Sequence, residues 1–277
     1  MSLLASRIAV LGPADIDCRA YVNAVGANGG SVSLSRQSLL SRALFGPLKV
    51  AGTWALMDDA WLQVAENPVQ GLISLKQLRL GTAVGSPWGS TWPVDLGITY
   101  DGATQYVDTG FIPQTHKVTM AQDSARIAIY SRANVTSTGY VFGCASSGNR
   151  QLSTRPRITT NCAANTNCTG GSFTLGVNDT RGYFAASRAT PDATTNFGFK
   201  NGASIVRASD PTGYVSPGVG MPLVSLLMGA LNNAGTPSNF SVGTLGFAAV
   251  GAPLSSAQEL AEYNILQGYM TALGAQV

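Results

Sequence analysis

Apolar side chains recur every three or four residues over the first 66 residues of the chain, which is the spacing of helices with one buried face. A first helix is predicted over residues 15–25. A second starts after Ser33 or Ser35, either of which can cap it, and Pro47 should kink or restart it. A third helix is expected over residues 54–65. Its buried stripe would consist of Leu56, Met57, Ala60, Trp61 and Val64.

Beyond residue 94 the pattern changes to short alternating runs between Gly, Asn, Asp and Pro, which is typical of β-strands. Many short strands with turn residues between them predict a β sandwich, a jelly roll included. The apolar stretch Val224–Leu231 fits either a buried strand or a helical turn. The predicted strands are Lys117–Met120, Arg126–Tyr130, Tyr140–Cys144, Ser172–Val177, Gly182–Ala186, Phe197–Lys200 and Ser204–Arg207.

Helical spacing returns at the end of the chain. Ser256 and Glu259 match a capping box, in which the serine accepts the N3 amide hydrogen and the glutamate reaches back to the serine amide. Gly274 should end this helix. Its predicted buried face is Leu260, Tyr263, Leu266, Met270 and Leu273. The chain is thus expected to have an N-terminal helical part with a connector, residues 1–93, and a sandwich with a closing helix, residues 94–277.

Two tryptophans lie in the connector between these parts. Trp88 and Trp92 flank a Gly-Ser-Thr sequence and have Pro87 and Pro93 outside them. Exposed tryptophans can bind the faces of sugar rings, which makes both residues candidate ligand contacts. A tryptophan beside proline in a linker can instead pin two structural units together.

The composition describes a weakly charged surface. Only 11% of the residues are charged and the net charge is +3, whereas 45% are apolar and 32 of 277 are glycine. Such a chain folds, because disorder requires high charge and few apolar residues. With only four lysines, the chain is not expected to bind nucleic acid, which needs clustered basic side chains. The most apolar stretch, residues 218–231, contains a proline and is too short to span a membrane.

Residue counts exclude several chemistries. His116 is the only histidine, so a zinc peptidase motif with two histidines is absent. No serine nucleophile elbow, phosphate-binding glycine loop or CxxC pair occurs. Cys162 and Cys168 could close a small loop, but free thiols are expected. The chain has three glutamates, Glu66, Glu259 and Glu262.

Residues 101–113 read Asp-Gly-Ala-Thr-Gln-Tyr-Val-Asp-Thr-Gly-Phe-Ile-Pro. This stretch resembles the opening hairpin of laminin-G-like, concanavalin-type jelly rolls. Asp101-Gly102 can form a tight turn with a positive φ. One of Tyr106 and Val107 should point into the sandwich, and Gly110 permits a bend before Phe111 enters the core.

Most of residues 14–274 resemble bacteriophage and prophage virion proteins. The resemblance includes Gly29-Gly30-Ser31, Gly52-Thr53-Trp54, the hairpin and the closing segment from Leu254 to Gly274. In such proteins a short helical region precedes a laminin-G-like jelly roll with a closing helix. The resemblance implies a tail, fibre or other particle component, with the helices as the docking element for another virion protein.

The concanavalin-type fold also includes enzymes that cleave sugars with paired carboxylates. Their E-x-D-x-x-E strand pattern is absent here, because no glutamate occurs between residues 67 and 258. No two aspartates of this region stand two residues apart on a plausible strand. We therefore expect no enzymatic activity.

Laminin-G-like domains sometimes bind calcium, which needs about six to eight oxygen ligands. Asp101, Asp108, Asp179 and Asp210 each lie near a turn and are explained as turn formers. We assign no calcium ligand and expect no other cofactor.

The basic cluster of the chain is Arg150, Arg155 and Arg157, followed later by Arg181 and Arg188. On one strand, Arg155 and Arg157 would share a face. They could bind an acidic sugar or a lipopolysaccharide phosphate through bidentate hydrogen bonds. The alternative is an edge strand whose charges discourage sheet-to-sheet aggregation.

These observations favour a non-enzymatic structural protein of a tailed bacteriophage, assembled into the virion in the bacterial cytoplasm. Its expected partners are other virion proteins and further copies of itself, with a trimer favoured, because oligomer interfaces disfavour charge. The alternative is an adhesin whose jelly roll binds polysaccharide on the host cell surface. No nucleic acid or membrane partner is expected.

Overall fold

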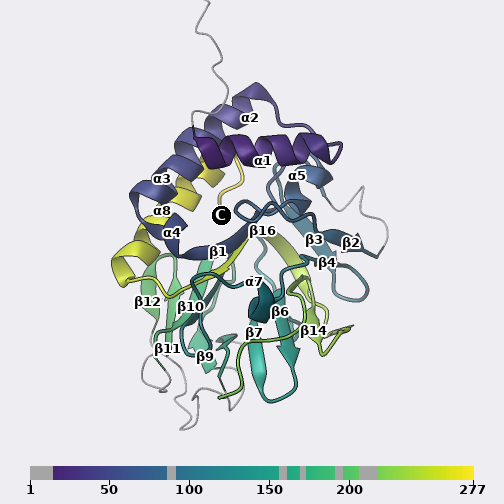
Figure 1. Ribbon diagram of the computed structural model, residues 1–277, viewed down its shortest axis with the longest axis vertical. Coiled ribbons are helices and arrows are strands. Elements are labelled where there is room, and N and C mark those ends of the chain that lie inside the picture. Colours follow the sequence, from purple (N-terminus) through teal and green to yellow (C-terminus); the bar gives the residue numbers. More distant parts are fainter. Residues whose placement is uncertain (1–14, 86–91, 156–160, 169–172, 191–195, 206–217) are drawn as a thin grey trace, which may run out of the picture.

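The computed structural model describes residues 15–85, 92–155, 161–168, 173–190, 196–205 and 218–277. Two β-sheets pack face to face, and a layer of helices covers the outer face of one of them (Figure 1). The prediction of a mainly β jelly-roll sandwich, preceded by helices and closed by a C-terminal helix, is confirmed. None of the described residues forms a helix both long and apolar enough to cross a bilayer.

The helical elements are α1 (Ile16–Ala27), α2 (Leu34–Leu39), the π-helix η1 (Leu40–Phe45), α3 (Gly46–Val50), α4 (Thr53–Leu56), α5 (Pro68–Leu72), α7 (Pro113–His116) and α8 (Ser256–Ala272). The strands are β1 (Met57–Leu62), β2 (Thr82–Val84), β3 (Ile98–Asp101), β4 (Tyr106–Asp108), β5 (Ala125–Ser131), β6 (Phe142–Ser146), β7 (Arg150–Arg155), β8 (Asn161–Thr166), β9 (Phe173–Gly176), β10 (Gly182–Arg188), β11 (Asn196–Lys200), β12 (Ala203–Ile205), β13 (Leu227–Met228), β14 (Leu231–Asn233), β15 (Thr236–Ser238) and β16 (Val242–Gly251).

The first sheet has the strand order β1-β16-β5-β10-β11-β12, and β3 also pairs with β16. The second sheet has the order β2-β4-β13-β6-β7-β8-β9, and β14 joins it through β6. The apolar stretch Val224–Leu231 contains the short strand β13 and the first residue of β14, and none of it is helical.

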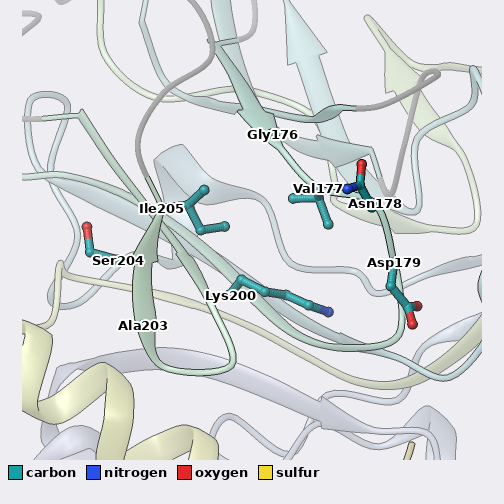
Figure 2. A pocket seen from close by; sticks show the side chains of 8 residues that line it. All are labelled: Gly176, Val177, Asn178, Asp179, Lys200, Ala203, Ser204 and Ile205. Atoms are coloured by element: carbon teal, nitrogen blue, oxygen red, sulfur yellow. The ribbon is translucent and has the colours of Figure 1, made fainter.

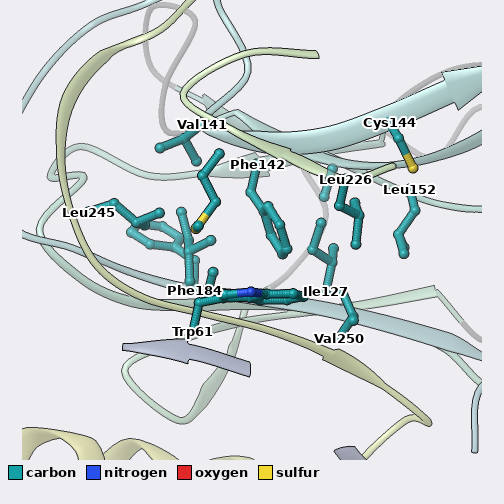
Figure 3. Close-up of a cluster of buried hydrophobic side chains, with 14 of the residues drawn as sticks. Trp61, Ile127, Val141, Phe142, Cys144, Leu152, Phe184, Leu226, Leu245 and Val250 are labelled. Carbon is teal, nitrogen blue, oxygen red and sulfur yellow. The ribbon is translucent and has the colours of Figure 1, made fainter. Parts of the chain in front are cut away.

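The central strands of the first sheet are buried on both faces, and this produces two hydrophobic cores. On β5, Ile127 and Ile129 point into the sandwich, whereas Ala128 and Tyr130 point toward the helices. The sandwich core centres on Trp61, whose ring lies 5.7 Å from that of Phe142 (Figure 3). Figure 1 shows α1 to α4 and α8 gathered on one side of the molecule, above the strands.

The predicted helix over residues 54–65 is wrong. Only Thr53–Leu56 is helical, and Met57–Leu62 forms strand β1, which pairs antiparallel with β16. Every residue of this strand is buried, because Trp61 faces the sandwich core while Ala60 and Leu62 face the helices. A strand buried on both faces lacks the apolar–polar alternation that would distinguish it from a helix.

The predicted boundary at residue 93 is crossed by both sheets, since β1 and β2 come from the N-terminal part. The helices pack on their own sheet, in one core with Ala128 and Phe247. The second helix begins after its cap Ser33. A π-helical turn then leads into α3, which starts at Gly46 and has Pro47 in its first turn.

Two further predictions near the hairpin need correction. Lys117–Met120 is not a strand, because the Asp58 carboxylate accepts hydrogen bonds from the amides of Thr119 and Met120 in place of a strand partner. The turn at Gly102 has the expected positive φ of 75°. It is not a hairpin within one sheet, however, since β3 pairs with β16 and β4 pairs with β2 and β13.

The closing helix begins one residue earlier than predicted. Ser255 is its N-cap, and the capping box joins Ser255 to Gln258. Leu260, predicted to be buried, is 47% exposed. Glu259, the predicted partner in the capping box, faces the first sheet instead.

A buried charge cluster attaches α8 to the first sheet. Arg126 on β5 donates to both carboxylate oxygens of Glu259, at 2.8 Å (Nε–Oε1) and 3.0 Å (Nη2–Oε2). Its Nη2 also lies 2.8 Å from Oε1 of Glu262. The Tyr183 hydroxyl on β10 donates to Glu259 at 2.6 Å. These side chains are at most 1% exposed, so the cluster is isolated from water.

Two carboxylates face a single guanidinium in this cluster, which leaves one negative charge uncompensated when both are ionised. Burial raises the pKa of Glu262, although Arg126 opposes the shift. Glu262 Oε2 is buried without a hydrogen-bond partner. A proton on Glu262 neutralises the cluster and removes the cost of the unpaired charge.

Replacing Glu262 by glutamine should make the free energy of unfolding less sensitive to pH. A carboxyl group with a raised folded-state pKa contributes stability below its unfolded pKa of about 4.3 and loses it as the pH rises through the folded pKa. Glutamine has no proton to lose. The Glu262→Gln variant should therefore gain stability relative to the wild type as the pH rises above about 4, by ~1.4 kcal/mol per unit of pKa shift. Urea denaturation followed by circular dichroism measures this difference.

The Glu259→Gln variant provides the contrast. It breaks the bidentate pair with Arg126 and should destabilise the protein by about 3 kcal/mol across this pH range. Parallel pH profiles for the wild type and Glu262→Gln would contradict the assignment of the proton to Glu262.

Candidate functional site

The outer face of the second sheet carries the strongest candidate site. On β7, Leu152 is fully buried in the sandwich core. Because side chains alternate along a strand, Gln151, Ser153 and Arg155 point to the outer face. Figure 1 places β7 beside β6, on the side of the molecule away from the helices.

Arg155 stacks on Tyr140, which leads into β6. The guanidinium carbon lies 4.1 Å from the ring centroid, and Nη2 donates to the Tyr140 hydroxyl. Nε2 of Gln151 donates to the same hydroxyl at 3.2 Å and to Oγ of Ser153 at 2.7 Å. We refer to Tyr140, Gln151, Ser153 and Arg155 as the Arg155 cluster. Its side chains hold one another in place, since the Tyr140 hydroxyl accepts two hydrogen bonds and its ring supports the guanidinium.

Two further aromatic side chains lie beside this cluster. Phe240 is bridged to Tyr140 through the backbone, and the Tyr140 amide donates to the Asn239 carbonyl at 2.9 Å. The Phe240 ring lies 6.2 Å from that of Tyr106 on β4. Both rings are partly exposed, and Tyr106 alternates with the fully buried Val107, which places it on the outer face.

The Arg155 side chain is partly exposed, although its Nε is buried. No carboxylate of the described residues forms an ion pair with it. A guanidinium recognises carboxylate or phosphate oxygens through paired N–H donors. Partly exposed aromatic rings beside it offer flat apolar surface. The arrangement is chemically suited to an acidic sugar.

Three of the other predicted arginines, Arg150, Arg181 and Arg188, lie away from this cluster. Arg150 lies at the opposite end of β7 and on the opposite face, with Leu152. Arg157 lies outside the described residues. Arg181 pairs with Asp179 at 2.7 Å on an exposed turn. Arg188 is fully buried and donates to the carbonyl oxygens of Thr166 and Asn167, so its role is structural.

Trp92 is a core residue, which corrects its prediction as a surface contact. It is 5% exposed, and its Nε1 donates to the Gln63 carbonyl at 3.0 Å. Its ring covers Gly71, where an added Cβ would lie 2.0 Å from Cζ2 of the tryptophan. Trp92 thus attaches the connector to the sandwich. Trp88 lies outside the described residues.

The acidic residues have structural partners. Glu66 accepts hydrogen bonds from the amide and hydroxyl of Ser33, and the other two glutamates bind Arg126. Asp101 accepts backbone amides of residues 103–105, and despite the opposing effect of burial these bonds hold its pKa well below the usual range. Across the residues that the structure describes, no three His, Cys, Asp or Glu side chains gather where they could hold a metal ion. Cys162 and Cys168 are free, buried thiols, as predicted.

Sequence reasoning missed Tyr140, Gln151, Tyr106 and Phe240 as parts of a site. Tyr140 stood at the start of a predicted strand, but nothing in the sequence pairs it with Arg155. Gln151 was identifiable in principle, because it stands two and four residues before Ser153 and Arg155 and so shares their face.

No protein-family model matches the sequence, and no curated protein matches it. Among solved structures, a Trypanosoma rangeli sialidase is 11% identical with a TM-score of 0.48; the similarity covers 77% of this chain and 33% of the sialidase. The CBM40 domain of the Ruminococcus gnavus IT-sialidase is 16% identical with a TM-score of 0.40, covering 66% of this chain and 96% of that domain.

Domain 4 of an extracellular arabinanase from Geobacillus stearothermophilus, solved with arabinotriose, is 12% identical with a TM-score of 0.40. This match covers 75% of the present chain and 98% of the arabinanase domain. The chain therefore spans about a third of the sialidase but nearly all of the two smaller domains. These similarities are too distant to assign a function.

Proposed function

We propose that the protein is a non-enzymatic structural component of a tailed bacteriophage particle and that it binds acidic glycans through the outer face of its second sheet. The Arg155 cluster is the observation that carries the binding proposal. It combines a guanidinium that has no carboxylate partner among the described residues, an ordered amide and hydroxyl network, and aromatic rings on one sheet face.

The partners of the glutamates support a non-enzymatic role. Sugar-cleaving enzymes of the paired-carboxylate kind need two acidic groups on either side of a bound sugar. Glu259 and Glu262 are instead buried between α8 and the first sheet, and Glu66 accepts a hydrogen bond from Ser33. None of the three reaches the outer face of the second sheet.

The place in a virion rests on the sequence resemblance over residues 14–274. Low surface charge agrees with a subunit that is largely covered in an assembly. The helices pack on their own sheet, so docking to another virion protein would use their outer side. The partners we propose are other particle proteins and further copies of this chain, with a trimer favoured.

Replacing Arg155 by methionine should weaken binding to acidic oligosaccharides on a glycan array by tenfold or more. A charge-assisted hydrogen bond contributes about 1.5–3 kcal/mol, and tenfold in affinity corresponds to about 1.4 kcal/mol. Arg155→Lys should bind weakly too, because an ammonium group cannot form the planar bidentate pair. Binding by the wild type should fall as salt is added.

Arg150→Met is the matched control, because Arg150 lies on the same strand but at the other end and on the other face. It should bind acidic glycans like the wild type. Equal losses in both variants, or no binding by the wild type, would remove the glycan proposal and leave the virion proposal standing.

Antibody against the purified protein should label intact phage particles in immunogold electron microscopy. Label at a tail or fibre tip would agree with glycan binding to the host, whereas label on the capsid or neck would indicate assembly or decoration. Protein found free or on cells, with unlabelled particles, would contradict the virion proposal.

Multi-angle light scattering of the purified protein should give a mass near three times the 28.6 kDa of one chain. The physical basis is the weakly charged surface, which favours burial between copies. A mass of one chain at high concentration, both alone and with particle extract, would contradict self-assembly.

A further inference from the structure

The last described strands of the two sheets, β9 and β12, lie at the same edge of the sandwich. A cavity of about 450 Å³ lies between the turn that follows β9 and the hairpin of β11 and β12 (Figure 2). We call it the edge slot. It is separate from the Arg155 cluster, and its size is within the range of pockets that hold small molecules.

The walls of the edge slot are apolar and continuous with the core. Val177 is 7% exposed and belongs to the sandwich core, and Ile205 packs against that core. Figure 2 shows the two side chains on opposite sides of the cavity, pointing toward each other. Ala203 adds a small apolar surface. An apolar group placed between these residues would be removed from water, which is favourable.

One cation in the edge slot lacks a counter-ion. The Lys200 side chain runs along the cavity toward Asp179 (Figure 2), with Nζ 3.9 Å from the Phe184 ring centroid. Nζ donates to the carbonyl of Arg181. The nearby carboxylate of Asp179 is paired with the Arg181 guanidinium at 2.7 Å. In the described part of the chain Lys200 therefore forms no ion pair, and its charge is balanced only by a carbonyl dipole and a ring face.

We propose that the edge slot binds an apolar carboxylate, with its hydrocarbon chain between Val177 and Ile205 and its carboxylate on Nζ of Lys200. The apolar walls favour the chain, and the half-buried ammonium favours an anionic end over a neutral one. The proposal is independent of glycan binding, which uses the other face of the second sheet.

The charge on Lys200 gives the binding a pH dependence. Burial lowers the pKa of Lys200 to about 8, with Arg181 acting in the same direction and Asp179 and Cys162 opposing it. The ammonium is thus present at about pH 7 and is lost by about pH 9. Carboxylate binding should weaken over that interval, whereas a neutral ligand should show no such change.

Isothermal titration calorimetry with octanoate and the full chain tests the proposal, with octan-1-ol as the neutral comparison. At about pH 7, octanoate should bind saturably at one site and more tightly than octanol. Lys200→Met should weaken octanoate binding at least tenfold. Lys117→Met is the matched control, because Lys117 Nζ also donates to a backbone carbonyl, that of Gln114, and lies outside the slot.

A second variant tests whether the cavity itself is needed for binding, while the positive charge of Lys200 is kept. Ala203 is exposed on the edge strand β12, so Ala203→Phe should fold and fill the cavity. It should abolish octanoate binding while Lys200 is intact. The proposal is overturned when the wild type shows no saturable octanoate binding, when Lys200→Met or Ala203→Phe binds like the wild type, or when octanol binds as tightly as octanoate.

Discussion

The first sheet is enclosed between the helices and the second sheet, so each of its central strands has to bury side chains on both faces. All seven residues of β5 and all seven of β10 are buried. On the side facing the helices, Ala60, Ala249, Ala128 and Ala185 stand next to one another across four strands. These small side chains leave room for the larger ones of the helices, such as Leu48 and Met270, within the same core.

A charged side chain buried on such a sheet needs hydrogen-bonding or oppositely charged partners from neighbouring elements, because water cannot reach it. Arg126 points toward the helices from the middle of the first sheet, where an unpaired guanidinium would cost several kcal/mol. The two glutamates of α8 and Tyr183 supply its hydrogen bonds, so the position of α8 along the sheet is set by this cluster. The same requirement explains Asp59, whose buried carboxylate accepts three backbone amides and whose pKa burial raises to about 6.

This architecture decides which surfaces are free to act. The helices cover the outer face of the first sheet, and the inner faces of both sheets form the sandwich core. Partly exposed side chains remain on the outer face of the second sheet, and a cavity remains at the edge formed by β9 and β12 among the described residues. The Arg155 cluster lies on the former and Lys200 on the latter, so the two proposed sites share no residue.

The sequence by itself determined those features that depend on the residue type at one position, such as helix caps, turns and bends. Ser33 caps a helix with its own hydroxyl, Gly102 and Gly110 adopt positive φ, and Phe111 enters the core after the bend, all as their residue types predict. Of the fourteen described strands beyond residue 94, six overlap strands predicted from alternation, namely β5, β6, β9, β10, β11 and β12. The same information placed Arg155 on a strand face and identified it as a candidate ligand contact.

Tertiary structure alone decided the rest, because it depends on pairing between distant residues. Met57–Leu62 became a strand only through β16, which lies about 190 residues further along the chain. Glu259 left the predicted capping box because Arg126 lies beneath it, and Trp92 became a core residue because Gly71 leaves room for its ring. Tyr140 and Arg155 come into contact because β6 pairs with β7. The pattern of apolar and polar residues within one segment cannot predict a contact between two segments. Sequence by itself determined what each segment could form, and the burial of both faces of the first sheet selected among those forms.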